Sequence, residues 1–200
     1  MTSRAYQKGI GFGEMAVVLL LLSMFVILCF PQFSNIILKA RLNGALQEIA
    51  LLLREKKIMA LSEECGVGLC FEQKGAGYTY RIYRDGNSNG IRRQDIEDGI
   101  DSPITEPLDI SERYRDVTFS ILSTPGIPEL PPGGGMLAPG GDPIRFSSDI
   151  LAFSPAGTSS SGSLYLTVGD RFMVALKLFG PTGRIRKFRY DGQRKIWRII

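Results

Sequence analysis

Apolar residues are concentrated near the N-terminal end of the chain. The segment MAVVLLLLSMFVILCF, Met15–Phe30, holds 16 residues, of which only Ser23 is polar. Extended back to Ile10, the segment reaches 21 residues. A helix of that length crosses a hydrocarbon core of about 30 Å. The pattern predicts a transmembrane helix over residues 10–30.

The residues on either side of this segment indicate how it is used. Residues 1–9 carry Arg4 and Lys8 and no acidic side chain, so by the positive-inside rule this basic leader stays in the cytoplasm. A secretory signal peptide would have a cleavage site of small residues after the apolar run. The chain instead continues CFPQF over 29–33. We therefore expect the apolar segment to be retained.

After Pro31 the chain becomes amphipathic. Apolar residues recur mostly three or four positions apart, as on one face of a helix, with charged and amide side chains between them. One helix over about 10–62, kinked near Pro31, fits both patterns. Its second half, 31–62, would lay an apolar stripe on a folded domain. The stripe comprises Ile37, Leu38, Leu42, Ala45, Leu46, Ile49, Leu52, Leu53 and Met59.

Beyond Ser62 the helical period ends and short strand-like runs follow. Residues 63–200 are expected to form a β-rich domain, and a long helix packed on an antiparallel sheet is an α+β architecture. The proline- and glycine-rich segment 125–143 is expected to be a long mobile loop. The predicted strands are Gly66–Phe71, Tyr78–Tyr83, Val117–Leu122, Ile150–Phe153, Ser163–Val168, Phe172–Phe179 and Arg184–Tyr190, with a short one within Lys195–Ile200.

Composition narrows the range of functions. The 200 residues include no histidine, which excludes Ser-His-Asp and Cys-His catalytic systems and the commonest zinc ligand. Three cysteines are too few for a disulfide scaffold, and the net charge of +4 does not by itself select a nucleic-acid partner. We expect a protein that is not an enzyme and has no cofactor or resident metal.

Glu14 stands at the start of the apolar segment. A carboxylate at the centre of a membrane span costs about 2.5–3.5 kcal/mol, and less near an end, so it marks either a function or a side chain that reaches the interface. Glu14 is the fifth residue after the Gly9–Ile10 bond, and Pro31 is the twenty-second. With the basic leader, these offsets resemble the class III signal of type IV pilins and pseudopilins. That family usually has phenylalanine where this chain has Ile10.

The C-terminal half is similar to one branch of that family. LAFSPAG over 151–157, GSLYL over 162–166 and TGRIR over 182–186 occur in the order found in GspH/FimT minor pseudopilins. The resemblance implies a pilin fold, cleavage after Gly9 by a prepilin peptidase and N-methylation of Ile10. It also implies roles for Glu14 and Pro31 in assembly.

The resemblance further implies a location and partners. The chain would be a single-pass protein of the bacterial inner membrane, with residues 63–200 in the periplasm. It would be a subunit of a type II secretion or type IV pilus filament. Its partners would be other pseudopilins and the inner-membrane assembly platform.

Two local patterns leave alternatives open. Asp85, Asn87 and Asn89 occupy the first ligand positions of a calcium loop, but the twelfth position is Ile96 rather than glutamate, so a polar turn is the competing interpretation. Cys65 and Cys70 would lie in a compartment that permits disulfides. Their bond requires residues 66–69 to turn rather than extend.

The last strand region is strongly basic. Arg184, Arg186 and Arg189 belong to a basic segment in which Phe188, Tyr190 and Trp197 are interleaved, a pattern that suits contact with DNA phosphates and bases. An edge strand protected from aggregation by its charges is the alternative. Some GspH/FimT relatives bind DNA through a comparable arginine-bearing tail. The sequence therefore predicts a minor pseudopilin first, and a DNA-capturing minor pilin as the alternative.

Overall fold

The computed structural model describes residues 11–75 and 77–200. The chain divides into two compact units, Met1–Leu38 and Lys39–Ile200. A continuous helix, α1 (Phe12–Ser62), includes residues of both units and runs through Pro31. The fold is α+β, as the sequence predicts.

The end of α1 at Ser62 agrees with the prediction. The N–H of Cys65 donates to the carbonyl of Ala60, and Glu64 has a φ of 51°, the left-handed conformation that glycine usually adopts after a helix. Strand β1 (Val67–Lys74) begins three residues later. The change from helix to strand is therefore made by a short capped turn.

In the second unit α1 buries one face. The buried apolar residues lie three or four apart, which gives the stripe expected of an amphipathic helix. The prediction is wrong at several positions: Leu38, Leu52 and Met59 are only partly buried, and Ile37 is 50% exposed. Lys56 and Ala60, which the predicted stripe does not include, are buried. The buried positions are Leu42, Ala45, Leu46, Ile49, Ala50, Leu53, Lys56 and Ala60.

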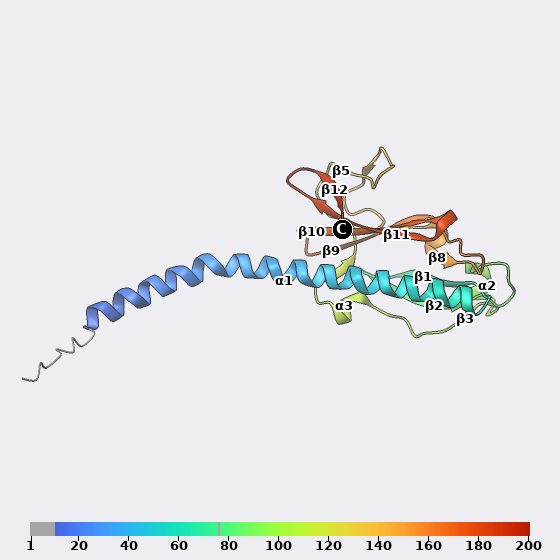
Figure 1. Ribbon diagram of the computed structural model, residues 1–200, viewed down its shortest axis with the longest axis horizontal. Coiled ribbons are helices and arrows are strands. Elements are labelled where there is room, and N and C mark those ends of the chain that lie inside the picture. Colours follow the sequence, from blue (N-terminus) through green and yellow to red (C-terminus); the bar gives the residue numbers. More distant parts are fainter. Residues whose placement is uncertain (1–10, 76) are drawn as a thin grey trace, which may run out of the picture. The chain divides into compact units, whose positions relative to one another are not determined.

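The strands form two main antiparallel sheets, and Figure 1 shows α1 beside strands of both. The first has the order β3-β2-β1-β8 and the second β12-β11-β10-β9-β4, with β7 also paired to β9. Besides β1, the first sheet contains β2 (Gly77–Arg84), β3 (Ser102–Pro103) and β8 (Ile150–Phe153). The second contains β4 (Val117–Phe119), β7 (Ile144–Arg145), β9 (Gly162–Val168), β10 (Phe172–Phe179), β11 (Arg184–Asp191) and β12 (Ile196–Ile199).

Short helices connect these strands. They are α2 (Arg93–Glu97), α3 (Ile110–Arg113), η1 (Ser147–Asp149) and η2 (Gly180–Thr182). The two sheets meet at three aromatic rings: Phe71 of β1 and Tyr80 of β2 each contact Phe119 of β4, with centroids 5.6 and 6.2 Å apart. Edge-to-face rings at this distance stabilise the junction beyond their buried area.

The segment predicted as a mobile loop is packed instead. It contains the hairpin β5 (Ile127–Pro128) and β6 (Met136–Leu137). Ile127, Leu130 and Leu137 are buried against Tyr165 and Phe188 of the second sheet. The predicted strand Val117–Leu122 is shorter than expected and ends at Phe119; Ile121 and Leu122 lie beyond it and pack in this same cluster.

Candidate functional site

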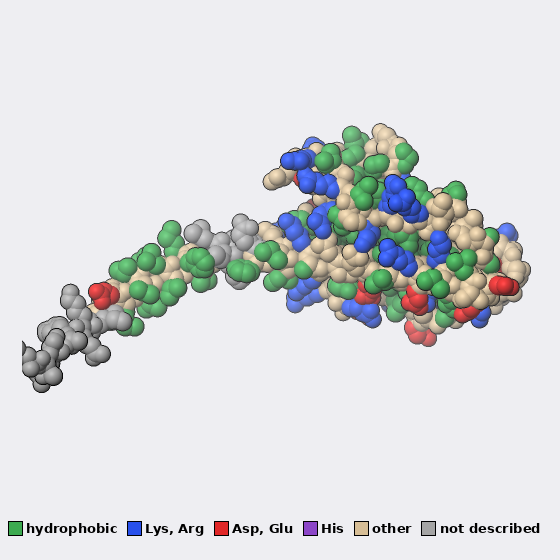
Figure 2. Space-filling view, in the orientation of Figure 1, with side chains coloured by type: hydrophobic (Ala, Val, Ile, Leu, Met, Phe, Trp, Pro, Cys, Tyr) green, Lys and Arg blue, Asp and Glu red, His purple; other side chains and the backbone are tan. Residues whose placement is uncertain are grey.

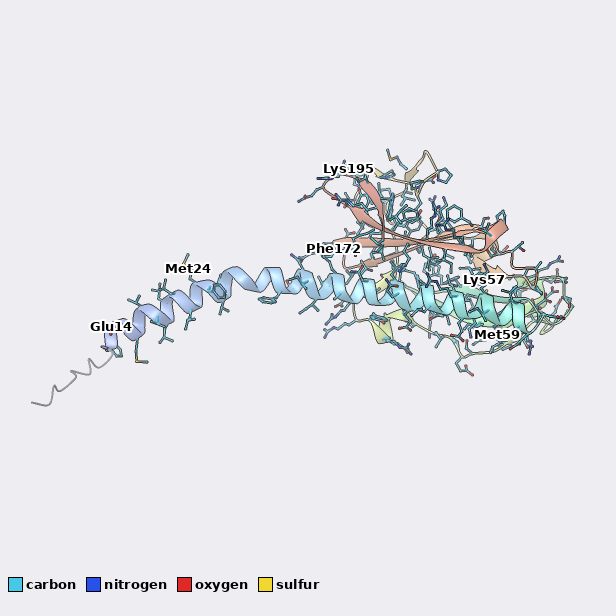
Figure 3. The ribbon with its side chains drawn as sticks, in the orientation of Figure 1. Glu14, Met24, Lys57, Met59, Phe172 and Lys195 are labelled. Atoms are coloured by element: carbon cyan, nitrogen blue, oxygen red, sulfur yellow. The ribbon has the colours of Figure 1, made fainter. Side chains whose placement is uncertain are left out.

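The residues of the predicted N-terminal signal lie only partly within the described residues. Gly9 and Ile10 lie outside the described residues. Glu14 stands in the first turn of α1, where its Oε2 accepts a hydrogen bond from the N–H of Gly11 at 3.1 Å (Figure 3). The N–H of Glu14 donates to the carbonyl of Gly11 at 3.0 Å. The Glu14 side chain thus makes the glutamate half of a capping box, which directs the carboxylate toward the start of the helix, where the helix dipole favours a negative charge.

The apolar side chains after Glu14 are uncovered in the isolated chain. The large apolar residues from Phe12 to Ile27 are each between 55 and 91% exposed. In soluble proteins an apolar surface of this extent marks contact with a membrane or another protein. Within the part of the chain that the structure describes, no helix contains a stretch both long and apolar enough to span a bilayer.

Both cysteines of the predicted disulfide are free thiols in the structure. Residues 67–74 form strand β1, so the turn that the bond requires is not made. The Cys65 Sγ lies 3.1 Å from the carbonyl oxygen of Asp85, whereas Cys70 packs with Tyr83 and Ile150 on the opposite face of the first sheet from Phe71. Burial raises the pKa of the Cys70 thiol, which keeps it protonated.

The loop with the calcium-like pattern uses its side-chain oxygens internally. Asp85 accepts hydrogen bonds from the backbone N–H groups of Asn87, Ser88 and Gly90, at 2.7 to 3.1 Å. Asn87 Oδ1 accepts one from the N–H of Asn89. Within the described residues, no three acidic or thiol side chains gather in an arrangement that could hold a metal. The geometry is that of the competing interpretation, a polar turn held by an aspartate.

The three arginines of the predicted DNA surface do not share one face of β11. Side chains alternate along a strand, so Arg184 and Arg186 lie on one face and Arg189 on the other. The Arg186 guanidinium lies 5.2 Å from the centroid of the Phe179 ring. Arg189 donates to Asn43 Oδ1 of α1 at 3.0 Å. The strand therefore directs its cations to two separate surfaces.

One of these surfaces is a groove of about 610 Å³ beside the first turns of α1 in the second unit. We call it the basic groove. Figure 3 shows Phe172 and Lys195 at this end of the unit, and Figure 2 shows Lys and Arg gathered there. Its charged lining residues are Lys39, Asp170, Arg171, Arg189, Asp191, Lys195 and Arg198.

Most of this groove carries no signal in the sequence. Arg189 and Lys195 belong to the basic C-terminal segment, whereas Lys39 and Arg171 come from two distant parts of the chain. Lys39 lies on α1 with its Nζ 4.8 Å from the centroid of the Phe172 ring. No spacing in the sequence indicates that α1 and the start of β10 are neighbours, so only the fold shows this cluster.

A second groove, of about 930 Å³, lies between α1 and α3 and is acidic. Its lining includes Glu48, Glu55, Asp109 and Glu112 against a single cation, Arg113, which pairs with Glu48. Tyr80 forms part of its wall, and burial together with the nearby Glu48 carboxylate raises the pKa of Tyr80 to about 12. The second unit thus presents two grooves of opposite charge.

The described residues thus form two grooves, one lined mainly by cations and one mainly by carboxylates. Comparison of the chain with protein-family models, with curated proteins and with solved structures gives no match. Its function is therefore argued from its own residues.

Proposed function

We propose that this chain is a minor pseudopilin: a subunit that enters the inner membrane through residues 10–30, is cleaved after Gly9 and joins a periplasmic filament. The observation that carries the proposal is the spacing of Gly9, Glu14 and Pro31 around an apolar segment that follows a basic leader. Each feature alone also occurs in unrelated proteins, but their fixed offsets are specific to prepilin signals.

The architecture supports the proposal. A helix of 51 residues whose second half packs on antiparallel sheets is the arrangement a pilin-like subunit requires. The exposed apolar side chains of 12–27 need an apolar environment, and both a bilayer and the helices of neighbouring subunits provide one.

The role proposed for Glu14 follows from its cost in the membrane. An isolated carboxylate in hydrocarbon is poorly solvated, and pairing with a cation reduces that cost. Cleavage after Gly9 would create a free amine at residue 10, four residues before Glu14. The capping geometry directs the carboxylate toward that end of the helix. Pairing with the amine of a neighbouring subunit would then favour assembly over the isolated, membrane-inserted state.

Replacing Glu14 tests this role. Glu14→Val should enter the membrane at least as well as the wild type, because the costly carboxylate is gone. It should not be incorporated into filaments, because the neighbour's amine loses its partner. The measurement is co-purification of other pseudopilins with the tagged full-length chain from membranes, read by mass spectrometry. Glu63→Val, a matched loss of an exposed acid outside the segment, serves as control. Normal recovery of partners with Glu14→Val would refute the pairing.

The geometry does not favour DNA capture as a second function. The aromatic rings that would stack on bases are packed in the core of the domain: Phe188 is buried, and Tyr190 and Trp197 are partly buried and pack against the same core cluster. Trp197 also donates its indole N–H to the carbonyl of Pro128 at 2.7 Å. With the arginines divided between two faces of β11, this geometry does not favour a stacking surface for nucleic acid.

A further inference from the structure

In the basic groove the acidic side chains have partners within the protein, whereas several of the basic ones do not. Both acids are held by the protein itself: Asp170 accepts a hydrogen bond from the N–H of Ser123, and Asp191 pairs with Arg198 at 2.8 Å. Asp191 also accepts from the N–H groups of Gln193 and Arg194. The negative charges of the groove are thus directed at local partners rather than at its opening.

The cations at the opening remain available. Lys39, Arg171 and Lys195 are exposed. Over residues 11–75 and 77–200, none of the three side chains makes a hydrogen bond or an ion pair; the Lys39 ammonium contacts the Phe172 ring. Arg189 is bonded to the neutral amide of Asn43, so its charge is not compensated there. The groove therefore presents several uncompensated positive charges to an anionic ligand.

The place of the groove in the chain limits what it meets. Lys39 is the first residue of the second unit, and Lys39, Leu42 and Asn43 form one wall of the groove. Phe30, the last residue of the apolar segment, is nine positions earlier. Nine residues span about 14 Å as a helix and at most about 32 Å fully extended. A groove tethered so closely to a membrane anchor stays near the bilayer surface whatever the relative orientation of the two units.

We propose that the basic groove docks on the phosphate headgroups of anionic phospholipids at the membrane surface, before the subunit is assembled. This inference rests on the proposed function, because it needs residues 10–30 to be anchored in a bilayer. Clusters of Lys and Arg beside a membrane anchor gain from the negative potential of anionic lipids, and each cation adds roughly a fivefold preference. Docking would hold the folded domain at the surface until neighbouring subunits compete for it.

The shape of the groove favours a headgroup over a nucleic acid. A duplex presents a long, regular row of phosphates and is held by cations spread over an extended surface. Here the free cations surround one hollow of about 610 Å³, within the size range of pockets that hold small molecules. The exposed turn between β11 and β12, which carries Lys195, forms one rim of the hollow.

Hydrogen exchange of the full-length chain in nanodiscs tests the proposal. Discs of phosphatidylcholine alone are compared with discs containing phosphatidylglycerol, and exchange is followed by mass spectrometry over residues 169–173 and 191–195. We expect exchange in both segments to be slower in the anionic discs by at least about fivefold, the preference that a single cation adds. High salt should remove the difference, because it screens charges at the surface.

Two matched triple variants assign the effect to the groove. Lys39→Gln, Arg171→Gln and Lys195→Gln together should abolish the lipid dependence. Arg54→Gln, Lys74→Gln and Arg92→Gln remove the same charge from exposed positions outside the groove and should preserve it. The proposal would be overturned if the wild type exchanged equally fast in the two kinds of disc. It would also be overturned if both triple variants lost the lipid dependence to the same extent.

Two further outcomes separate the alternatives. Addition of a short DNA duplex to phosphatidylcholine discs should leave exchange in the groove unchanged; slowing as strong as that from phosphatidylglycerol would make the groove a nucleic-acid surface and reject the lipid assignment. A full-length chain that does not enter discs at all would instead overturn the proposed membrane function, and with it this inference.

Discussion

Asp101 is 1% exposed, and its carboxylate organises the loop that follows β2. Its Oδ1 accepts a hydrogen bond from the N–H of Gly86 and its Oδ2 one from the N–H of Arg92. Buried carboxylates are tolerated when their oxygens are satisfied in this way. Gly86 is required at this contact, because a Cβ there would lie 2.0 Å from the carbonyl oxygen of Ile100.

Removing the Asp101 carboxylate should destabilise the domain. Asp101→Ala removes the acceptor of two partly buried backbone N–H groups, and a hydrogen bond to a charged group contributes about 1.5–3 kcal/mol. We expect the free energy of unfolding to fall by about 2–4 kcal/mol, measured by thermal unfolding of the full-length chain in detergent. Asp98→Ala, a nearby exposed aspartate, is the control and should change stability by less than about 0.5 kcal/mol. If Asp101→Ala lowered the free energy of unfolding as little as the control does, the hydrogen bonds of Asp101 would not be what stabilises the loop.

Ionisation of Tyr80 should lower the stability of the domain at alkaline pH. Its pKa is raised to about 12 by burial and by the Glu48 carboxylate, against about 10 in the unfolded chain. The neutral phenol is therefore favoured in the folded state. The stability that the neutral Tyr80 phenol contributes to the folded state is complete below pH 10. It is lost as the pH rises from 10 toward 12, because the unfolded chain then loses a proton that the folded chain keeps.

Tyr80→Phe should reduce this alkaline loss. Between pH 9 and 11 the melting temperature of the variant should fall less steeply than that of the wild type, because the phenylalanine side chain does not ionise. Tyr78→Phe is the comparison. Tyr78 is less buried than Tyr80, and its pKa is raised by burial and by the nearby Asp142 carboxylate. Parallel pH curves for Tyr80→Phe and the wild type would contradict the assignment.

At the scale of elements, helix α1 was more predictable than the segments that cover the sheets. The amphipathic period places its end at Ser62, and the apolar run Phe172–Phe179, interrupted only by Lys177, coincides with β10. These signals are local. The packing of Ile127, Leu130 and Leu137 under the second sheet depends on contacts distant in sequence. A composition rich in proline and glycine therefore predicted a loop where a packed hairpin forms.

Strand β11 carries the element-scale test of DNA binding. Arg184→Gln, Arg186→Gln and Arg189→Gln together should leave the salt dependence of duplex binding by the full-length chain nearly unchanged, because the three cations lie on two faces. Removing one phosphate contact would reduce the slope of log affinity against log salt by about 0.9. A gel-shift titration at several salt concentrations measures this slope. A reduction by about two or more would establish β11 as a nucleic-acid surface.

At the scale of the whole molecule, the proposed signal and the two grooves differ in how far the sequence alone indicates them. The proposed prepilin signal is a set of fixed offsets, so Gly9, Glu14 and Pro31 are named from the sequence. The basic and acidic grooves are assembled from distant segments and carry no such pattern. Removal of the leader would take away Arg4 and Lys8 and no acid, so the net charge would fall from +4 to +2.

Processing of the leader is the event on which the proposed function depends. Cleavage by a prepilin peptidase requires the glycine that precedes residue 10, so Gly9→Val should leave a full-length precursor in the membrane. Gly13→Val is the matched control, because nothing lies within 4 Å of the Cβ it would add. That variant should be processed like the wild type.

The most direct measurement is the N-terminal residue of the mature chain recovered from bacterial membranes, determined by mass spectrometry. The proposal predicts that the wild type begins at a methylated Ile10 and that Gly9→Val begins at Met1. A wild-type chain that keeps residues 1–9, or one whose mature form begins beyond Phe30, would contradict the assignment as a pseudopilin.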